Sequence, residues 1–233
     1  MNKRSFIAVG ALVSCLCLSS LAQAGYVVQA SVGANAKDYL NYVTFDALVD
    51  NGDGTFTENG LTLSMTPDAK LVTGASSGKY AEPYLTGNNN LYFGVLYEGK
   101  DTTQYVTTGS TGSSVGAKAT MTFASDQWHF GLLWGSVDTY NTLSFYDSND
   151  VLLFVVDSDD LPPPAVGNQG PGGTVYATIS AGDSWGFRKV VAESSKYAFE
   201  FDNVSYGVPE PAAMLVWGFL GIVGLCWLRR RKA

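Results

Sequence analysis

Apolar and polar residues alternate through most of the chain between Tyr26 and Tyr206. Successive side chains of a β-strand point to opposite faces, so this alternation predicts strands with one buried face. Residues 61–66 and 117–123 show the pattern most clearly. The side chains predicted to face inward are Leu61, Leu63 and Met65; Ala119, Met121 and Phe123; Trp128, Phe130, Leu132 and Trp134; Leu143 and Phe145; Val175, Ala177 and Ile179; and Tyr197, Phe199 and Phe201.

Residues 151–156 are continuously apolar, which predicts a strand covered on both faces. Turn-forming residues separate the predicted strands, with Asx and Gly at 50–54, 58–60, 87–90, 147–150 and 181–183. No long stretch of this region has helical periodicity. The pattern therefore predicts an all-β fold, an antiparallel β-sandwich with jelly-roll-like connections. Residues 157–173 lack strand character and form either a functional loop or a surface excursion.

The first 24 residues have the organisation of a secretory signal peptide. Lys3 and Arg4 are followed by the apolar residues 6–18, and Ala22 and Ala24 form a small-x-small cleavage site. The mature chain is then expected to begin near Gly25. Residues 12–15 also resemble a lipobox, which would instead place a lipid on Cys15; both interpretations predict export.

The last 26 residues, 208–233, form three blocks. Pro209, Glu210 and Pro211 precede an uncharged apolar run at 212–228, and a basic cluster follows, made of Arg229, Arg230, Arg231 and Lys232. At about 1.5 Å per residue the run would span roughly 25 Å as a helix, slightly less than a hydrocarbon core of about 30 Å. A transmembrane helix is therefore predicted, and the cations place its end in the cytoplasm.

This order of blocks resembles a PEP-CTERM sorting signal, with residues 209–211 as its motif. The resemblance implies that an exosortase in the inner membrane recognises and removes the tail. It also implies delivery to the cell surface or the extracellular polysaccharide matrix of a Gram-negative bacterium. Residues 130–146 and 199–204 are similar to a central block and a final strand in one group of exosortase-dependent surface proteins. That second resemblance implies surface location and a β fold, and it identifies no ligand.

The region between the two terminal segments, 25–207, is one domain of ordinary size with a strongly acidic composition. The chain has 14 basic and 21 acidic residues. The signal peptide holds two of the basic residues, the tail holds four, and Glu210 is one of the acids. The domain therefore has 8 basic and 20 acidic residues, a net charge of −12. This charge argues against nucleic acid and anionic membrane surfaces as partners.

Cysteine and histidine are nearly absent from the domain. Cys15, Cys17 and Cys226 all lie in the terminal segments, which excludes disulfides, thiol catalysis and cysteine-ligated metal within residues 25–207. The single histidine, His129, makes a histidine-type zinc site implausible. No catalytic, cofactor-binding or metal-binding residue is assigned.

Three alternatives remain open. Ser76 and Ser114 each lie in a Gly-x-Ser-x-Gly segment, but neither is followed by the helix that a nucleophile elbow requires, so no enzyme is expected. The 50–54 segment is interpreted as an ordinary turn, with a structural calcium site at Asp50 or Asp53 as the alternative. Tyr140, Tyr146 and Trp185 are the aromatic residues least clearly buried, and they could serve a carbohydrate-binding surface.

The sequence therefore predicts an exported surface or matrix protein with a structural or interaction role. A lectin-like carbohydrate-binding module is the alternative, and a secreted hydrolase is the second alternative. The expected partners are the exosortase and export machinery, extracellular polysaccharide, and the membrane through residues 212–228 before processing.

Overall fold

The computed structural model describes residues 25–32, 41–85, 99–109, 116–161, 166–170, 172–181 and 186–208. The predicted signal peptide, the sorting motif and transmembrane segment at 209–233, Ser114 and Trp185 lie outside these ranges. The regular secondary structure of the described residues is almost entirely β-strands in antiparallel sheets, which confirms the predicted all-β class. Within these ranges no helix is long and apolar enough to cross a bilayer.

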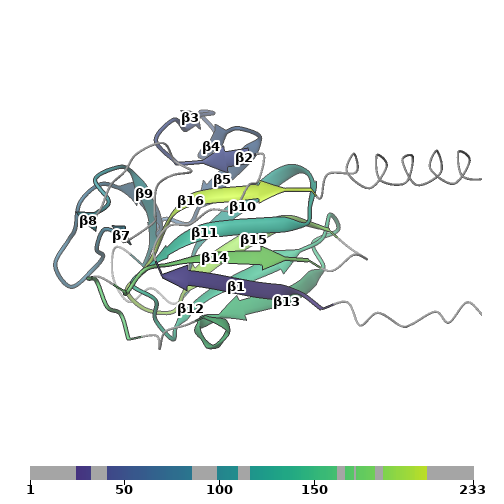
Figure 1. Ribbon diagram of the computed structural model, residues 1–233. Coiled ribbons are helices and arrows are strands. Elements are labelled where there is room, and N and C mark those ends of the chain that lie inside the picture. The colour runs from purple at the N-terminus through teal and green to yellow at the C-terminus, as the bar shows by residue number, and fades with distance from the viewer. Residues whose placement is uncertain are drawn as a thin grey trace, which may run out of the picture.

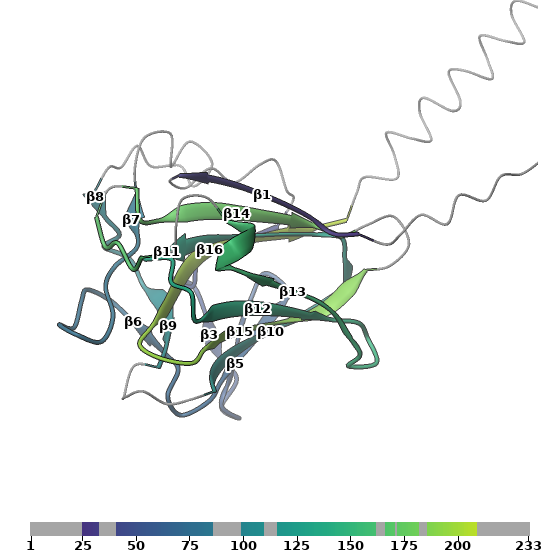
Figure 2. The same cartoon turned by 90° about the horizontal axis from the view of Figure 1, so that it is seen from below.

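Two seven-stranded sheets form the body of the molecule (Figures 1 and 2). The first sheet has the order β1 (Val27–Val32), β14 (Val175–Ser180), β11 (His129–Gly135), β16 (Phe199–Gly207), β9 (Tyr105–Thr108) and β6 (Lys70–Val72), and β2 (Asn41–Val43) also pairs with β16. The second has the order β13 (Leu152–Asp157), β12 (Asn141–Tyr146), β15 (Phe187–Ser194), β10 (Ala117–Gln127), β5 (Leu61–Met65), β4 (Thr55–Glu58) and β3 (Val49–Asp50). Figure 2 shows the two sheets as separate layers.

The main core lies between these layers and is rich in phenylalanine. Phe145 stacks on Phe154 with ring centroids 4.4 Å apart, and it meets Phe130 and Phe187 edge-on at 5.5 and 5.1 Å. Such pairs contribute about 0.5–1.5 kcal/mol each beyond the area they bury. Of the side chains predicted to face inward, all but three are fully buried in this core. Met65 is partly buried against it, and Trp128 and Tyr197 are only partly buried outside it.

The prediction that Trp128 faces the core is wrong, and the path of the chain explains why. The sequence suggested one strand through 127–134, but the chain bends at Trp128, between the end of β10 and the start of β11. β10 belongs to the second sheet and β11 to the first, so Trp128 lies at the crossing between the layers and not inside them.

The prediction that residues 151–156 are covered on both faces is also wrong. β13 is an edge strand, and it pairs only with β12. Phe154 and Val156 enter the core, whereas Val151, Leu152 and Val155 are 57%, 50% and 37% exposed. A continuous apolar run shows that both faces of a strand carry apolar side chains. It does not show whether a second layer of structure covers the outer face of the sheet.

The outer face of the first sheet is covered at one end by residues 76–85 and by the hairpin of β7 (Tyr84–Leu85) and β8 (Gly99–Lys100). Leu133 and Tyr176 point to this outer face and form a small second core with Leu85. The same cover contacts β16, because the Ala81 N–H donates to Glu200 Oε1 at 2.9 Å; β7 and β8 lie at the left of Figure 1.

β16 changes register at Asn203, which has a positive φ of 50°. The partner strand shifts register between Gly131 and Leu133, so the extra residue forms a β-bulge. Phe199 and Phe201 before the bulge, and Val204 and Tyr206 after it, all enter the main core. Because side chains alternate along a strand, Glu200 and Asp202 point to the outer face.

Candidate functional site

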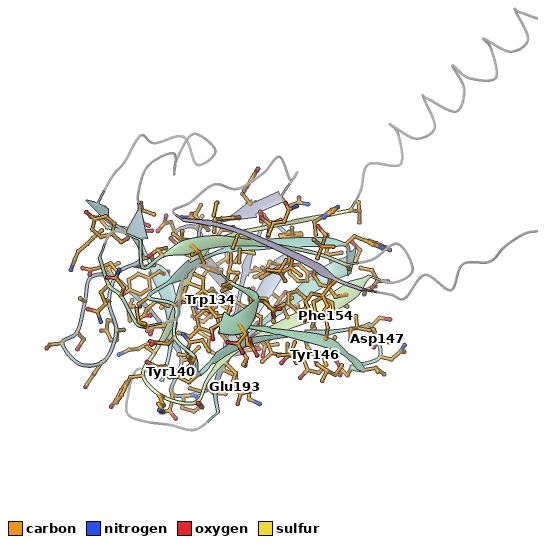
Figure 3. All side chains as sticks on the ribbon, turned by 60° about the horizontal axis from the view of Figure 1, so that its bottom comes forward. Trp134, Tyr140, Tyr146, Asp147, Phe154 and Glu193 are labelled. Atoms are coloured by element: carbon orange, nitrogen blue, oxygen red, sulfur yellow. The ribbon has the colours of Figure 1, made fainter. Side chains whose placement is uncertain are left out.

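A polar pocket of about 330 Å³ lies at one end of the sandwich, where the chain passes from β11 to β12. We call it the Tyr140 pocket. Figure 3 labels Tyr140 at this end of the molecule and Tyr146 toward the other. The lining residues are Gly78, Lys79, Ser136, Asp138, Tyr140, Val166, Gly167, Gln169, Tyr197, Ala198 and Glu200.

Glu200 is the most deeply buried carboxyl group of the pocket, with only 2% of the residue exposed. Ser136 Oγ donates to its Oε2 at 2.7 Å, and the Ala81 backbone N–H donates to its Oε1 at 2.9 Å. Burial raises the pKa of Glu200 to about 7; the two hydrogen bonds oppose this shift, and the charge of Asp138 adds to it. The folded protein therefore retains a proton on Glu200 well above the pH at which a free glutamate loses it.

Asp138 and Tyr140 form a second polar pair at the mouth of the pocket. The Tyr140 hydroxyl donates to Asp138 Oδ2 at 2.6 Å. Burial raises the pKa of both groups. Lys196 Nζ lies 5.4 Å from the centroid of the Tyr140 ring, and its charge partly lowers the pKa of Asp138. The pair is thus held in a fixed geometry with a cation beside it.

The long connection after β13 supplies one wall of this pocket. It begins with the 3₁₀ helix η1 (Ser158–Asp160), and its later residues return to β11. The Gly167 N–H donates to Val137 O at 3.0 Å, and the Val137 N–H donates to Gly173 O at 3.2 Å. Gly167 has a φ of 64°, and a Cβ there would lie 2.8 Å from Asp138 Oδ1. The described part of this connection therefore packs against the end of the sandwich and lines the pocket with Val166, Gly167 and Gln169.

The pocket combines hydrogen-bond donors and acceptors with two tyrosine rings. Ser136 and Gln169 supply a hydroxyl and an amide, Asp138 and Glu200 supply carboxyl groups, and Lys79 supplies an ammonium. Tyr140 and Tyr197 supply flat, partly apolar walls. The pocket can therefore both donate and accept hydrogen bonds beside aromatic surface.

The serine and histidine singled out in the sequence do not come together here. Ser76 lies in a tight turn, where it bridges to Tyr80, and no helix follows it. His129 begins β11 and lies 2.9 Å from Ser180 Oγ, while Ser136 follows the other end of β11. At about 3.3 Å per residue, His129 is roughly 20 Å from the pocket.

Asp50 and Asp53 form the turn that the sequence predicts. Asp50 Oδ1 accepts the Gly52 N–H at 2.8 Å, and Asp53 Oδ1 accepts both the N–H and the hydroxyl of Thr55 at 3.0 and 2.6 Å. These Thr55 hydrogen bonds lower the pKa of Asp53. Both carboxylates thus bond to their own turn, and the alternative of a calcium site there gains no support from their geometry.

In the described part of the chain, no three or more His, Cys, Asp or Glu side chains gather in a group that could hold a metal ion.

The aromatic residues proposed for a sugar-binding surface are separated. Tyr140 lines the pocket, while Tyr146 lies at the far end of β12 with Lys189 Nζ 4.5 Å from its ring centroid (Figure 3). The described residues define a protein of two packed antiparallel sheets with a polar pocket at the Tyr140 end. No protein-family model and no curated protein matches the chain.

Proposed function

We propose that this chain is an exported surface or matrix protein that an exosortase processes. The support comes from the sequence: a signal peptide at 1–24, and the Pro209-Glu210-Pro211 motif followed by an apolar run and a basic cluster. The domain between these segments is acidic and contains no cysteine, so core burial must hold it together outside the cell without disulfides.

The finer fold assignment is a jelly roll. In support, β9, β16, β11 and β14 are neighbours in one sheet, and β10, β15, β12 and β13 are neighbours in the other. Between β9 and β16 the chain passes repeatedly from one sheet to the other, and the first and last of these eight strands pair with each other. Jelly rolls have eight strands in two sheets with Greek-key connections.

The domain's interaction role is saccharide binding in the Tyr140 pocket. The observation that carries this proposal is the combination of two tyrosine rings with hydroxyl, amide and carboxyl groups in a pocket of about 330 Å³. That volume is near the lower end of the usual range of about 300–1,000 Å³ for small-molecule sites, so it fits one or two sugar units.

Two acids in the pocket favour neutral over acidic sugars. Asp138 is partly buried in the pocket and Glu200 is fully buried there, so a uronate carboxylate would place a further negative charge close to Asp138, and close to Glu200 whenever Glu200 is ionised. Like charges in a partly desolvated site repel each other strongly. Sugar hydroxyls, in contrast, can donate hydrogen bonds to both carboxyl groups.

Calorimetric titration of the full-length chain in mild detergent with neutral and uronic oligosaccharides tests this proposal. We expect the wild type to bind a neutral sugar, and we expect Tyr140→Ala to bind it with at least tenfold lower affinity. A tenfold change corresponds to a loss of about 1.4 kcal/mol of binding free energy. Tyr146→Ala is the matched control, because Tyr146 ends the same strand at the far end of the sandwich. Absence of saccharide binding, or equal binding by both variants, would refute the proposal.

The hydrolase alternative is tested separately. The proposed binding role predicts that incubation with these oligosaccharides yields no cleavage products. Cleavage that disappears in Ser76→Ala would instead support an enzyme and would replace the binding role.

A further inference from the structure

A second pair of acids is buried away from the Tyr140 pocket, under the cover on the outer face of the first sheet. Asp202 in β16 is fully buried, and Asp101, just after β8, is 3% exposed. The two carboxyl groups lie within hydrogen-bonding reach of each other. They are separated by about a hundred residues in sequence, so the fold brings them together.

No side chain of the described structure donates a hydrogen bond to Asp202, and neither of its carboxyl oxygens has a partner with good hydrogen-bond geometry. Burial and the neighbouring Asp101 raise the pKa of Asp202 well above its usual value, and the backbone N–H of Asn203 only partly opposes this shift. Asp101 Oδ1, by contrast, accepts both the N–H and the hydroxyl of Thr103, at 2.9 and 2.6 Å. Two ionised carboxylates have no hydrogen between them, so their contact is repulsive unless a proton or a cation lies there.

The surrounding chain holds both acids in place without neutralising them. The Asp101 N–H donates to Pro83 O at 2.8 Å. Gln104 connects this region to Phe45 and Asp46. Its backbone N–H donates to Asp46 Oδ1 at 2.9 Å, and its side-chain amide donates to Phe45 O at 2.8 Å. Asp46 adds another negative charge near Asp202. The ion pairs among described residues join Lys100 to Glu82, Lys118 to Glu193, Arg188 to Asp126 and Lys189 to Asp150, and none includes Asp101 or Asp202.

An unpaired buried carboxylate costs several kcal/mol, and a fold that brings a second one into contact with it must gain something in return. We propose that Asp101 and Asp202 together bind one Ca²⁺ ion, which joins the β7–β8 cover to β16. The ion turns the repulsion between the two carboxylates into attraction to a shared dication.

The chemistry of the pair favours Ca²⁺ over other common metals. All side-chain donors are carboxylate oxygens, which excludes the nitrogen and sulfur ligands that Zn²⁺ prefers. Only two carboxylates contribute, so backbone carbonyls and water must complete the shell. Ca²⁺ accepts such mixed sets of six to eight oxygens in irregular geometry, whereas Mg²⁺ demands a near-ideal octahedron.

The test is thermal unfolding of the full-length chain in mild detergent at pH 7.5, in EDTA and in 10 mM CaCl₂. For an extracellular-type site with a Kd of about 0.1 mM, this concentration raises Tm by about 5–10 °C. In Asp202→Asn the calcium-induced shift is lost, while its Tm in EDTA equals or exceeds that of the wild type because a buried charge is gone. Asp53→Asn is the control: it changes the surface turn that was the rival calcium candidate, and it retains the full shift.

Terbium luminescence provides a second readout that does not depend on melting. Tyr105 lies near enough to Asp101 for that charge to contribute to its raised pKa, so excitation of tyrosine should sensitise Tb³⁺ bound at the pair. Calcium should displace the signal, and Asp101→Asn should remove it. If calcium leaves Tm unchanged, or if Asp202→Asn retains the shift or the displaceable signal, the site is refuted and the two acids share a proton.

Discussion

Replacing Glu200 by glutamine should remove a defined part of the protein's pH-dependent stability. Glu200 is 2% exposed and its pKa is raised to about 7, chiefly by burial. A glutamine has nearly the same shape, can accept the Ala81 N–H with its oxygen and can donate to Ser136 Oγ with its amide. The substitution therefore removes the titration and retains the packing.

The sign of the effect follows from proton linkage. In the unfolded chain Glu200 loses its proton near the ordinary glutamate pKa of 4.5, but in the folded chain it retains the proton up to about pH 7. Between these values the native state binds more protons, so stability falls as the pH rises. The contribution is fully present below pH 4.5 and is lost as the pH passes 7. At about 1.36 kcal/mol per unit of pKa difference, the free energy of unfolding falls by at most about 3 kcal/mol over this range.

Thermal unfolding of the wild type and of Glu200→Gln at pH 4.5, 5.5, 6.5 and 7.5 measures this contribution. Asp202 also has a raised pKa and gives both proteins a slope of the same sign, so only the difference between them reports on Glu200. We expect the wild type to lose about 6–12 °C relative to the variant across this range. A constant difference would mean that the folded state does not hold the Glu200 proton, and the electrostatic account of the pocket would be wrong.

Two further predictions concern other parts of the chain. Gly131→Ala should destabilise the protein by about 1–3 kcal/mol in urea unfolding, because a Cβ there would lie 2.5 Å from Ser205 Oγ and 2.8 Å from the Tyr176 ring. Gly207→Ala is the matched control, because an added Cβ there meets nothing within 4 Å and the backbone does not have a positive φ; an equal loss of stability in both variants would show that crowding is not the cause. Glu210→Ala should leave an uncleaved protein that stays in the membrane. Intact-mass analysis of the released wild-type protein should show that residues 212–233 are absent. A released wild-type product that still carries Arg229 to Lys232 would contradict the sorting hypothesis.

The sequence predicted the strands well because alternation directly reports which face of a strand is buried. Leu61 and Leu63, or Leu143 and Phe145, needed no knowledge of their partners. Apart from Trp128, where the chain crosses from one sheet to the other, the failures concern what covers the outer face of a sheet. Leu152 was predicted to be covered and is exposed, whereas Leu133 occupies an outward position and is buried under the cover that includes Leu85. Periodicity contains no information about that second layer.

The pocket could not be located from the sequence for the same reason. Tyr140 was recognised as an aromatic residue outside the predicted core, but nothing in its neighbourhood indicated that residues 166–169 and Glu200 would join it. Glu200 occupies an outward position of a strand, where a carboxylate ordinarily meets water. Only the tertiary contact with Ala81 turns it into a buried acid.

One short segment of β16 joins both proposed sites. Residues 199–202 read Phe-Glu-Phe-Asp, and the two-residue period of the strand sends both rings into the main core and both acids to the outer face. The cover then buries Glu200 beside Ser136 and Asp202 beside Asp101. Both acids would be simpler to accommodate as neutral residues if this cover served stability alone. Two costly burials at adjacent outward positions, each near a second carboxyl group, therefore support the two proposals made above: saccharide binding at the pocket that includes Glu200 and cation binding at Asp202.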